Sequence, residues 1–328
     1  MSENPLEIRA YRTGDEAGII DCLNRTLEKG YSLEEWSWRF PPSSRGRPIM
    51  IAVSDGRVLA HVAATPAHLQ IDDQIIKAAA IENGVVDPSV GNSDARMELL
   101  VETTTAMISR CLESGEFDQV FFRGERNEAT EWAKIMNGVT VDLPAVESLR
   151  RTGASLFRIR RLAYRAEPAR DWEPRLGDLW QRVRGAYPAA VVRDAEYSLA
   201  RYSGHPSVRY HRFLAFPRFS NRAVAFAVFR CDEGKCQWVD FVWDHRHPGA
   251  IELLGHVSSS LSHQTGAEME EVWLAGDPAG RHCLGRLGFV EQPSAKQMSL
   301  SVRAAAIEPE RVQSLDRLFL TMGDLRPR

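Results

Sequence analysis

Hydrophobic and polar residues along the first half of the chain form a pattern of short strands separated by helices. Two apolar runs flank the polar pair Asp55-Gly56, and this arrangement predicts a β-hairpin. The predicted strands lie at 8–11, 49–53, 58–65, 69–71, 79–86 and 120–122. The predicted helices lie at 15–28, around Trp36, at 94–113 and at 128–135. Hairpins followed by a strand–helix–strand–helix order predict a mixed sheet with helices on its faces.

The second half of the chain repeats this order, with its long central helix at 247–262. A helix that ends in arginine and an aromatic residue precedes a hairpin in both halves, at Arg39-Phe40 and at Arg201-Tyr202. Two similarities in the same order, this one and a strand–glycine–acid motif at Gly124 and Gly276, predict a duplicated domain. We expect an N-terminal domain at 1–145, an arginine-rich linker or strand at 146–175 and a C-terminal domain at 176–328.

Composition narrows the class of protein. A chain of 328 residues is long for one core and suits two domains. The formal net charge of −3 argues against a globally basic nucleic-acid binder and against a polybasic membrane binder. No run approaches about 18 apolar residues, and the N-terminus lacks the apolar segment of a signal peptide, so we expect a cytoplasmic protein without a membrane partner. Cys231 and Cys236 have no second pair beside them, so we expect neither a zinc site nor a disulfide framework.

Three local pieces carry a resemblance to a known family. They are Val85-Val86-Asp87-Pro88 at the end of the fourth strand, Asn127 after the fifth, and Leu287-Gly288-Phe289 at the end of the last helix. Together with the element order, they resemble the GNAT acyltransferase superfamily in tandem form. The resemblance implies an α/β fold of two GNAT-like domains. Each would have a mixed, mostly antiparallel sheet with splayed central strands and flanking helices.

The resemblance also implies a co-substrate, acetyl-CoA or another acyl-CoA. In the family, the splayed strands hold the pantetheine arm, and a basic glycine-rich turn at a helix N-terminus cradles the pyrophosphate. Carried over to this chain, the contacts are Val85, Val86 and Asn127 in the first half, and Phe241, Val242, Arg246, Gly249 and Ala250 in the second.

Both turns depart from the family pattern. In the first half, Gly91 stands where arginine is expected, and Asp94 and Arg96 occupy glycine positions. A carboxylate there would repel a phosphate, although Asp94 also suits a helix N-cap. In the second half, Arg246 and Gly249 keep part of the pattern. Charge therefore favours the second domain as the CoA site, while the strand ending favours the first.

Amine acylation needs a base to take a proton from the attacking ammonium. Glu82 and Asp240 are the candidate catalytic bases, because each is a carboxylate within an apolar strand, where burial without a partner is costly. The tyrosine that serves as the acid in the family is missing, and Trp132 and Leu284 stand near its place. We further expect the aromatic residues of the Trp36 and Tyr202 helices to face the acceptor, unless they pack in the core. They are Trp36, Trp38 and Phe40 in the first half, and Tyr197 and Tyr202 in the second.

Seven arginines lie between 150 and 170, where Phe157 and Ile159 alternate with Arg158 and Arg160. This pattern predicts a half-buried strand that is either a track for an anionic substrate or a solvated connection. Three functions follow. The first is acyl-CoA-dependent N-acyl transfer to the primary amine of a small molecule. The second is a Fem-type ligase that uses aminoacyl-tRNA, and the third is a non-catalytic relative that binds a ligand or partner.

Overall fold

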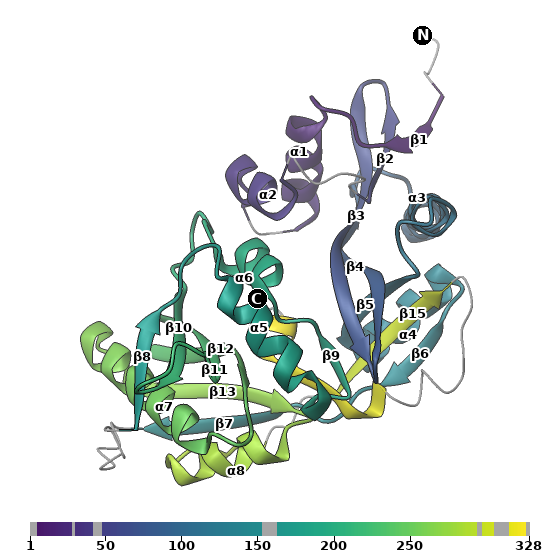
Figure 1. The fold of residues 1–328 in the computed structure, drawn as a ribbon. Helices are drawn as coiled ribbons and strands as arrows, with labels where there is room; N and C mark the ends of the chain where they lie inside the picture. Colours follow the sequence, from purple (N-terminus) through teal and green to yellow (C-terminus); the bar gives the residue numbers. More distant parts are fainter. Residues whose placement is uncertain are drawn as a thin grey trace. The chain divides into compact units, whose positions relative to one another are not determined.

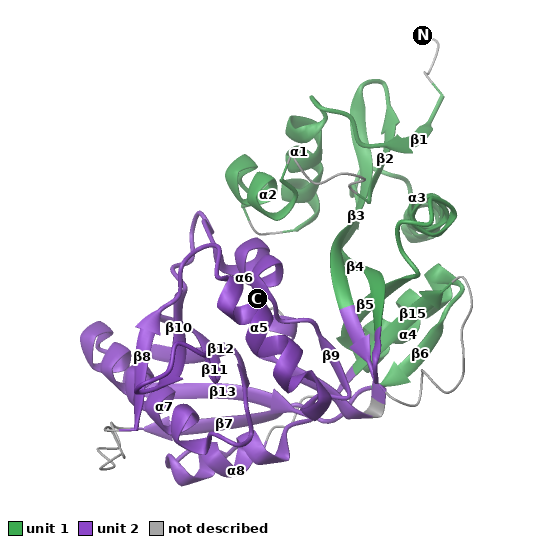
Figure 2. Ribbon diagram, viewed as in Figure 1, with its two compact units in different colours: residues 1–68, 75–142, 299–312 green, residues 69–74, 143–298, 313–328 purple. Residues whose placement is uncertain are grey.

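The computed structural model describes residues 5–27, 30–41, 48–152, 163–293, 297–304 and 315–325. The chain folds into two compact units, each assembled from separate stretches of sequence (Figures 1 and 2). Unit 1 comprises residues 1–68, 75–142 and 299–312, and unit 2 comprises residues 69–74, 143–298 and 313–328. Neither unit is therefore a single continuous segment.

Unit 1 is a mixed sheet with helices on both faces. Its strands are β1 (Glu7–Ala10), β2 (Ile49–Ser54), β3 (Arg57–Ile71), β4 (Gln74–Val86), β5 (Gln119–Glu125), β6 (Val139–Asp142) and β15 (Met298–Ala304). Its helices are α1 (Glu16–Thr26), α2 (Leu33–Arg39), α3 (Ser93–Glu113) and α4 (Arg126–Met136). The strand order is β1–β2–β3–β4–β5–β15–β6, in which β4 and β5 pair in parallel.

Unit 2 repeats this plan. Its strands are β7 (Glu147–Thr152), β8 (Tyr164–Pro168), β9 (Ala189–Val191), β10 (His211–Pro217), β11 (Ala225–Asp232), β12 (Lys235–Trp243), β13 (Met269–Ala275), β14 (Val290–Glu291) and β16 (Leu318–Thr321). Its helices are α5 (Pro174–Val183), α6 (Ala195–Tyr202), α7 (Pro248–Thr265), α8 (Pro278–Arg286) and α10 (Met322–Leu325), with 3-10 turns η1 (Arg184–Ala186) and η2 (Leu315–Arg317). The main order is β8–β10–β11–β12–β13–β7–β14, with β12 and β13 parallel.

The two units therefore share one strand order, which confirms the predicted pair of similar mixed-sheet domains. The sixth strand of each sheet comes from the other half of the sequence: β15 in unit 1 and β7 in unit 2. The stretch 146–175, expected to be an arginine-rich linker or strand, supplies strands β7 and β8 to the sheet of unit 2. The predicted alternation at Phe157–Arg160 lies outside the described residues.

Helices cover both faces of the unit 1 sheet. Helices α1 and α2 cover one face through a cluster that includes Ile19, Leu23, Trp36, Phe40, Ile51, Ala63 and Val85. Helix α3 covers the other face, in a cluster with Val62, Ile81, Met107, Ile108 and Val120. Trp36 and Phe40 are buried in the cluster beneath α1 and α2, and Tyr202 is buried in the core of unit 2. These three side chains are packing residues, so the prediction that they face an acceptor is wrong for them.

Local signals explain where α3 begins. Asn92 is its N-cap, and its side-chain oxygen accepts a hydrogen bond from the Ala95 amide at 2.9 Å. The proposal of Asp94 as the cap is wrong, because Asp94 lies inside the first turn. There, its negative charge is favourable to the helix dipole.

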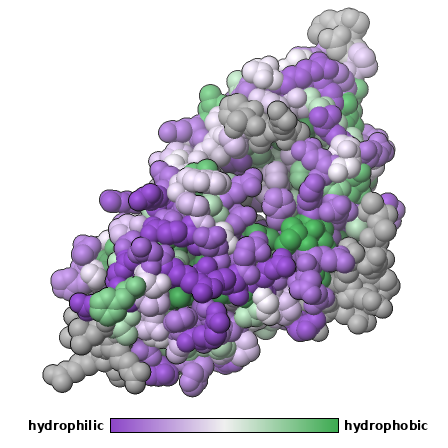
Figure 3. All heavy atoms as spheres, viewed as in Figure 1, coloured by the Kyte–Doolittle hydropathy of each residue, from purple (hydrophilic) through white to green (hydrophobic). Residues whose placement is uncertain are grey.

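Surface and cysteine features complete the fold. Cys231 and Cys236, which face each other across the β11–β12 hairpin, are joined by a disulfide that the sequence analysis did not expect. On the face drawn in Figure 3, hydrophilic residues predominate and hydrophobic residues gather in smaller patches. Within the described ranges, no helix is long and apolar enough to cross a membrane. The same part of the chain holds no cluster of three or more His, Cys, Asp or Glu residues that could bind a metal.

Candidate functional site

The central strands of unit 1 separate part of the way along their length. β4 and β5 pair from Ala78–Gln119 to Ala80–Phe121. Beyond that point, the described residues of these two strands do not pair with each other. The last six residues of β4 then continue without β5 beside them. A splayed pair of parallel strands exposes backbone N–H and C=O groups, which can bind an extended ligand.

The candidate base lies where β4 is irregular. Ile81 packs in the core cluster of α3, and a Cβ on Gly84 would meet Trp132 of α4. By contrast, Val85 packs with α1 and α2, and the Glu82 Oε1 atom accepts a hydrogen bond from the Thr65 hydroxyl at 2.7 Å. Strict alternation would not place residues 81 and 84 on the same face, so β4 contains an extra residue between them. Val85 and Val86 are buried directly after this irregularity.

The turn after β4 is held by a buried carboxylate. Asp87 is 1% exposed and forms ion pairs with Arg25 and Arg57. Burial by itself raises the pKa of Asp87, but hydrogen bonds from Ser89 and the two guanidinium groups outweigh it, so the pKa lies below its ordinary value. The carboxylate that ends the fourth strand is therefore a structural anion, already neutralised by two cations.

Beyond this turn, the N-terminus of α3 carries both signs of charge. The Arg96 Nη1 atom donates to the carbonyl oxygens of Val90 and Gly91, at 3.3 and 3.0 Å. Asp94 is exposed. Arg96, which the sequence analysis counted as a departure from the family pattern, thus lies next to the expected pyrophosphate turn.

Helix α4 brings two further residues to the splay. Asn127 is the second residue of α4 and is exposed. The Trp132 ring stacks on Phe122 of β5, with 5.0 Å between ring centroids. It also contacts Gly84 closely, since a Cβ there would lie 2.4 Å from the indole. An indole therefore lines the splay of unit 1 in the region where the family has a tyrosine.

Unit 2 has the same splay, but another strand fills it. β12 and β13 pair from Lys235–Met269 to Trp238–Val272. Past that point, β13 pairs with β16 at Leu274–Thr321 and Ala275–Leu320. Strand β7 already occupies the opposite edge of β13, so β16 lies on the side from which β12 diverges. The last described part of the chain thus occupies the place between the two central strands.

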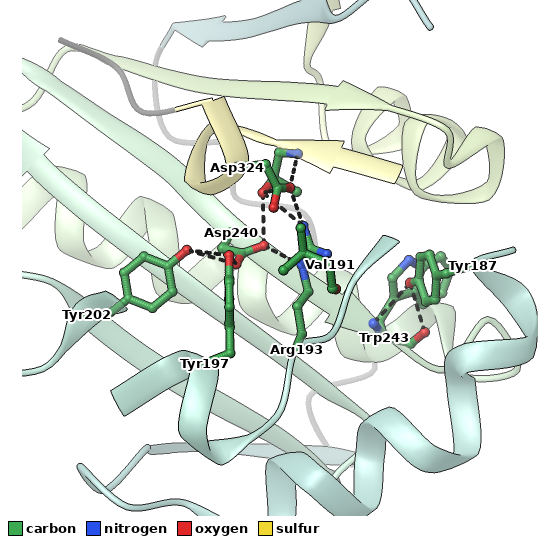
Figure 4. Close-up of polar contacts among 9 residues, drawn as sticks. Tyr187, Val191, Arg193, Tyr197, Tyr202, Asp240, Trp243 and Asp324 are labelled. Carbon is green, nitrogen blue, oxygen red and sulfur yellow. Dashed lines mark hydrogen bonds and ion pairs between the residues drawn. The ribbon is translucent and has the colours of Figure 1, made fainter. Parts of the chain in front are cut away.

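Asp240 belongs to the network that holds this C-terminal segment (Figure 4). The Asp240 Oδ1 atom accepts hydrogen bonds from Arg193 Nε at 2.8 Å and from the Thr321 hydroxyl at 2.9 Å. Its Oδ2 atom accepts from the hydroxyls of Tyr197 and Tyr202 at 2.9 and 2.8 Å.

The partners of Asp240 are as deeply buried as the carboxylate. Arg193 also forms an ion pair with Asp324 of α10, and the side chains of Arg193, Asp240 and Asp324 are at most 1% exposed. Burial and the neighbouring Asp240 charge raise the pKa of Tyr202 well above its ordinary value, so its hydroxyl stays protonated and donates. Each carboxylate oxygen of Asp240 therefore has two hydrogen-bond donors, and Asp240 shares the positive charge of Arg193 with Asp324.

The other unit 2 residues named from the sequence lie on β12 and at the start of α7. Phe241 and Val242 are fully buried in the core. Arg246 is 72% exposed and forms a bidentate ion pair with Asp244. Gly249 lies against the Tyr164 ring, and Ala250 is buried in the first turn of α7. A cavity of about 190 Å³ lies beside Arg222, Arg246 and His247.

Sequence reasoning did not identify Arg193, Thr321 or Asp324, and it named Tyr197 only as an aromatic residue that faces the acceptor. The usable signal was a charged residue within an apolar run, as at Val191-Val192-Arg193 and in 318–324. Such a residue is costly to bury unless it is paired. Its partners are separated by 47 and 131 positions, so the sequence alone did not connect them.

Comparison with known proteins identifies solved structures that have a similar fold. No model of a known protein family matches the chain, and no curated protein sequence does. Among solved structures, a probable N-acyltransferase from Enterococcus faecalis V583 is 10% identical with a TM-score of 0.67 and covers 90% of this chain and 72% of its own. A GCN5-related N-acetyltransferase from Kribbella flavida is 13% identical, with a TM-score of 0.66 and coverage of 90% and 71%.

Saccharomyces cerevisiae N-myristoyltransferase with bound myristoyl-CoA is also similar, at 10% identity and a TM-score of 0.59, covering 93% of this chain and 80% of its own. At identities this low, the structural similarity establishes the fold alone. The chemistry has to be argued from the residues of this chain. The shared strand order of the two units and these likenesses agree. The chain therefore has the GNAT fold in duplicated form.

Proposed function

We propose that this protein is an acyl-CoA-dependent N-acyltransferase whose acyl-CoA site lies in unit 1, with unit 2 serving as scaffold. One observation carries the assignment. Strand β16 fills the splay of unit 2, whereas no strand lies between β4 and β5 in the described part of unit 1. The filled splay of unit 2 therefore favours unit 1 as the acyl-CoA site, whereas the charges of the two turns favour the C-terminal domain.

The residues of unit 1 suit the parts of an acyl-CoA. The separated end of β4, with Val85 and Val86, offers backbone groups to the amides of the pantetheine arm. The start of α3, with Arg96 beside it, offers free N–H groups and a positive charge to the pyrophosphate. Asn127, in the first turn of α4, offers a side-chain amide on the other side of the splay.

Glu82 is the residue placed to act as the base. Thr65 donates a hydrogen bond to its carboxylate. Because Ile81 packs on the α3 face, strand alternation directs the next residue, Glu82, toward the face covered by α1 and α2. In the reaction, Glu82 takes a proton from the acceptor ammonium. The amine nitrogen then attacks the thioester carbon and the C–S bond breaks. The second proton leaves the nitrogen and reaches the departing thiolate through a water molecule, which gives an amide and CoA thiol. Backbone N–H groups of β4 polarise the thioester carbonyl.

A non-catalytic ligand-binding protein is the second candidate. The position of Trp132 favours it, because an indole N–H next to the splay is a much weaker acid than a tyrosine hydroxyl. Under this candidate, acyl-CoA would still bind but would not be consumed.

Release of CoA from acetyl-CoA in the presence of a panel of small primary amines separates the two candidates. The acyltransferase assignment predicts amine-dependent release that falls at least about 100-fold in Glu82→Gln, the usual scale for loss of a general base. Binding of acetyl-CoA should be retained in that variant. Binding without release for any amine would favour the non-catalytic candidate, and absence of both would refute the assignment.

A further inference from the structure

One buried side chain of unit 1 has no place in the function described so far. His61 of β3 is fully buried, and neither of its ring nitrogens has a hydrogen-bond partner among the described residues. Burial lowers the pKa of His61 to about 3, so the ring is neutral at physiological pH. A neutral imidazole carries one donor and one acceptor, and burying both without partners costs stability.

The surroundings of His61 are apolar. Ile51 lies directly opposite it in β2, and the Phe40 ring meets it edge-on with 6.4 Å between centroids. A phenylalanine or leucine would suit this environment better. A resident water is a poor explanation as well, because a buried water needs two to four polar partners. The imidazole is therefore best explained by a ligand group that it meets in another state of the site.

Two contacts locate His61 relative to the proposed reaction centre. On β3, the Leu59 carbonyl accepts a hydrogen bond from the Asp87 amide at 2.8 Å. The Thr65 hydroxyl donates to Glu82 at 2.7 Å. His61 lies between these two points, so it is opposite the stretch 82–87 of β4, which contains the candidate base.

A second unpartnered group lies in that same stretch. The Nδ2 atom of Asn83, the residue after Glu82, is buried, and the part of the chain that the structure describes gives it no hydrogen-bond partner. An amide N–H and a neutral imidazole together offer donors and one acceptor. This combination complements a hydroxyl or a carboxamide, each of which both donates and accepts. A charged group would find no counter-ion among the apolar residues around the imidazole.

We propose that His61 and Asn83 form a subsite that recognises an uncharged hydroxyl or carboxamide group on the amine acceptor, reached when Phe40 moves off the imidazole. The inference rests on the proposed function and adds a substrate class to it. The acceptor is then an amine whose second polar group enters the face beneath α2. Sites built to hydrogen-bond a substrate group discriminate strongly against analogues that lack it.

The test compares linear amino alcohols with linear amines of matched length, in which a methyl group replaces the hydroxyl, using acetyl-CoA as the donor. We expect the wild type to favour the amino alcohol by at least about tenfold in kcat/KM at the best chain length. His61→Phe should abolish this preference, and Asn83→Ala should reduce it. His68→Gln, an exposed change on the same strand, should retain it.

Thermal unfolding supplies a readout that is independent of turnover. His61→Phe should raise Tm, because it removes two unsatisfied polar atoms, whereas a structural histidine would lower it on replacement. A lower Tm, or a hydroxyl preference that is absent from the wild type or survives in His61→Phe, overturns the subsite alone. If no amine causes the wild type to release CoA, the proposed function is overturned, and the subsite with it.

Discussion

At the scale of single residues, the two candidate bases differ in their partners. Asp240 has four donors and is fully buried, whereas Glu82 is partly exposed and accepts from Thr65. A carboxylate whose lone pairs are all occupied and whose charge is neutralised is a poor proton acceptor. By residue type alone, Glu82 and Asp240 are equally good candidate bases. Their burial and their hydrogen-bond partners show that Glu82 is the better proton acceptor.

Asp240→Asn should destabilise the protein strongly. Arg193 keeps Asp324 as its counter-ion, but an asparagine amide nitrogen cannot accept the two hydrogen bonds that one carboxylate oxygen of Asp240 accepts. A buried donor that loses its acceptor costs about 1–3 kcal/mol. We expect a decrease of about 3 kcal/mol in the free energy of unfolding, measured by urea denaturation. Glu82→Gln is the matched control and should change stability by less than about 1 kcal/mol. Equal effects of the two substitutions would contradict the distinction.

His61 should also make stability depend on pH. Its folded-state pKa of about 3 lies below the ordinary value of 6.5, so as pH falls below about 6.5 the unfolded state gains a proton that the folded state cannot take. Stability is therefore lost on the acid side. At pH 5, the wild type should have lost about 2 kcal/mol more than His61→Phe, relative to pH 7.5. Parallel pH profiles of unfolding for the two proteins would contradict the buried neutral state.

At the scale of elements, the segment β16–α10 determines what unit 2 can bind. Its fit depends on a residue without a side chain, because a Cβ on Gly323 would lie 2.2 Å from the Tyr202 hydroxyl and 3.2 Å from the Val239 carbonyl oxygen. Glycine is required here for close approach between the segment and β12.

Gly323→Ala should therefore displace α10 and disturb the donors around Asp240. We expect a loss of about 2 kcal/mol in unfolding free energy, within the range for overpacking a core. Gly285→Ala in α8 is the control, since its Cβ would meet nothing within 4 Å and alanine favours a helix. Unchanged stability of Gly323→Ala would show that the segment is not packed in the splay.

Elements were predictable from sequence where their signal was local. The hairpin at Asp55-Gly56, the end of β4 at Asp87 and the helix after it appear in the structure as expected. The partners of β7, β15 and β16 were not predictable. An apolar strand reads the same whichever sheet it joins, and pairing across more than 100 residues is decided by the whole fold.

At the scale of the whole molecule, each of the two sheets contains a strand from the other half of the sequence. β15 lies between β5 and β6 in the sheet of unit 1, and its Leu300 and Val302 are buried there. A sheet that lacks this strand has an unpaired apolar edge and a gap in its core.

A fragment of residues 1–145 should therefore not fold alone. We expect weak, non-cooperative thermal transitions by circular dichroism and aggregation on size exclusion. Co-expression with the fragment 146–328 should restore a folded complex, because that fragment carries β15. A monomeric fragment 1–145 with a cooperative transition would contradict the account of strand exchange.

The choice of active unit shows what sequence could and could not indicate at this scale. The charges at Asp94 and Arg246 favoured unit 2, and this inference considered only the pyrophosphate turns. In the structure, Arg246 is paired with Asp244, Arg96 lies at the other turn, and β16 fills the splay of unit 2. The pairing of β16 with β13 is remote in sequence. The Asp244–Arg246 and Gly91–Arg96 contacts span only two and five positions, but they depend on side-chain geometry that the residue types do not specify. Each of the three changes the balance toward unit 1.

Calorimetric titration with acetyl-CoA tests the assignment to unit 1 most directly, with two charge reversals at equivalent turns. We predict one molecule bound per chain, binding weakened at least about tenfold by Arg96→Glu, and binding unchanged by Arg246→Glu. Asp94→Lys should strengthen binding by removing a nearby negative charge. Two molecules per chain, or binding lost in Arg246→Glu and retained in Arg96→Glu, would contradict the assignment of acyl-CoA to unit 1.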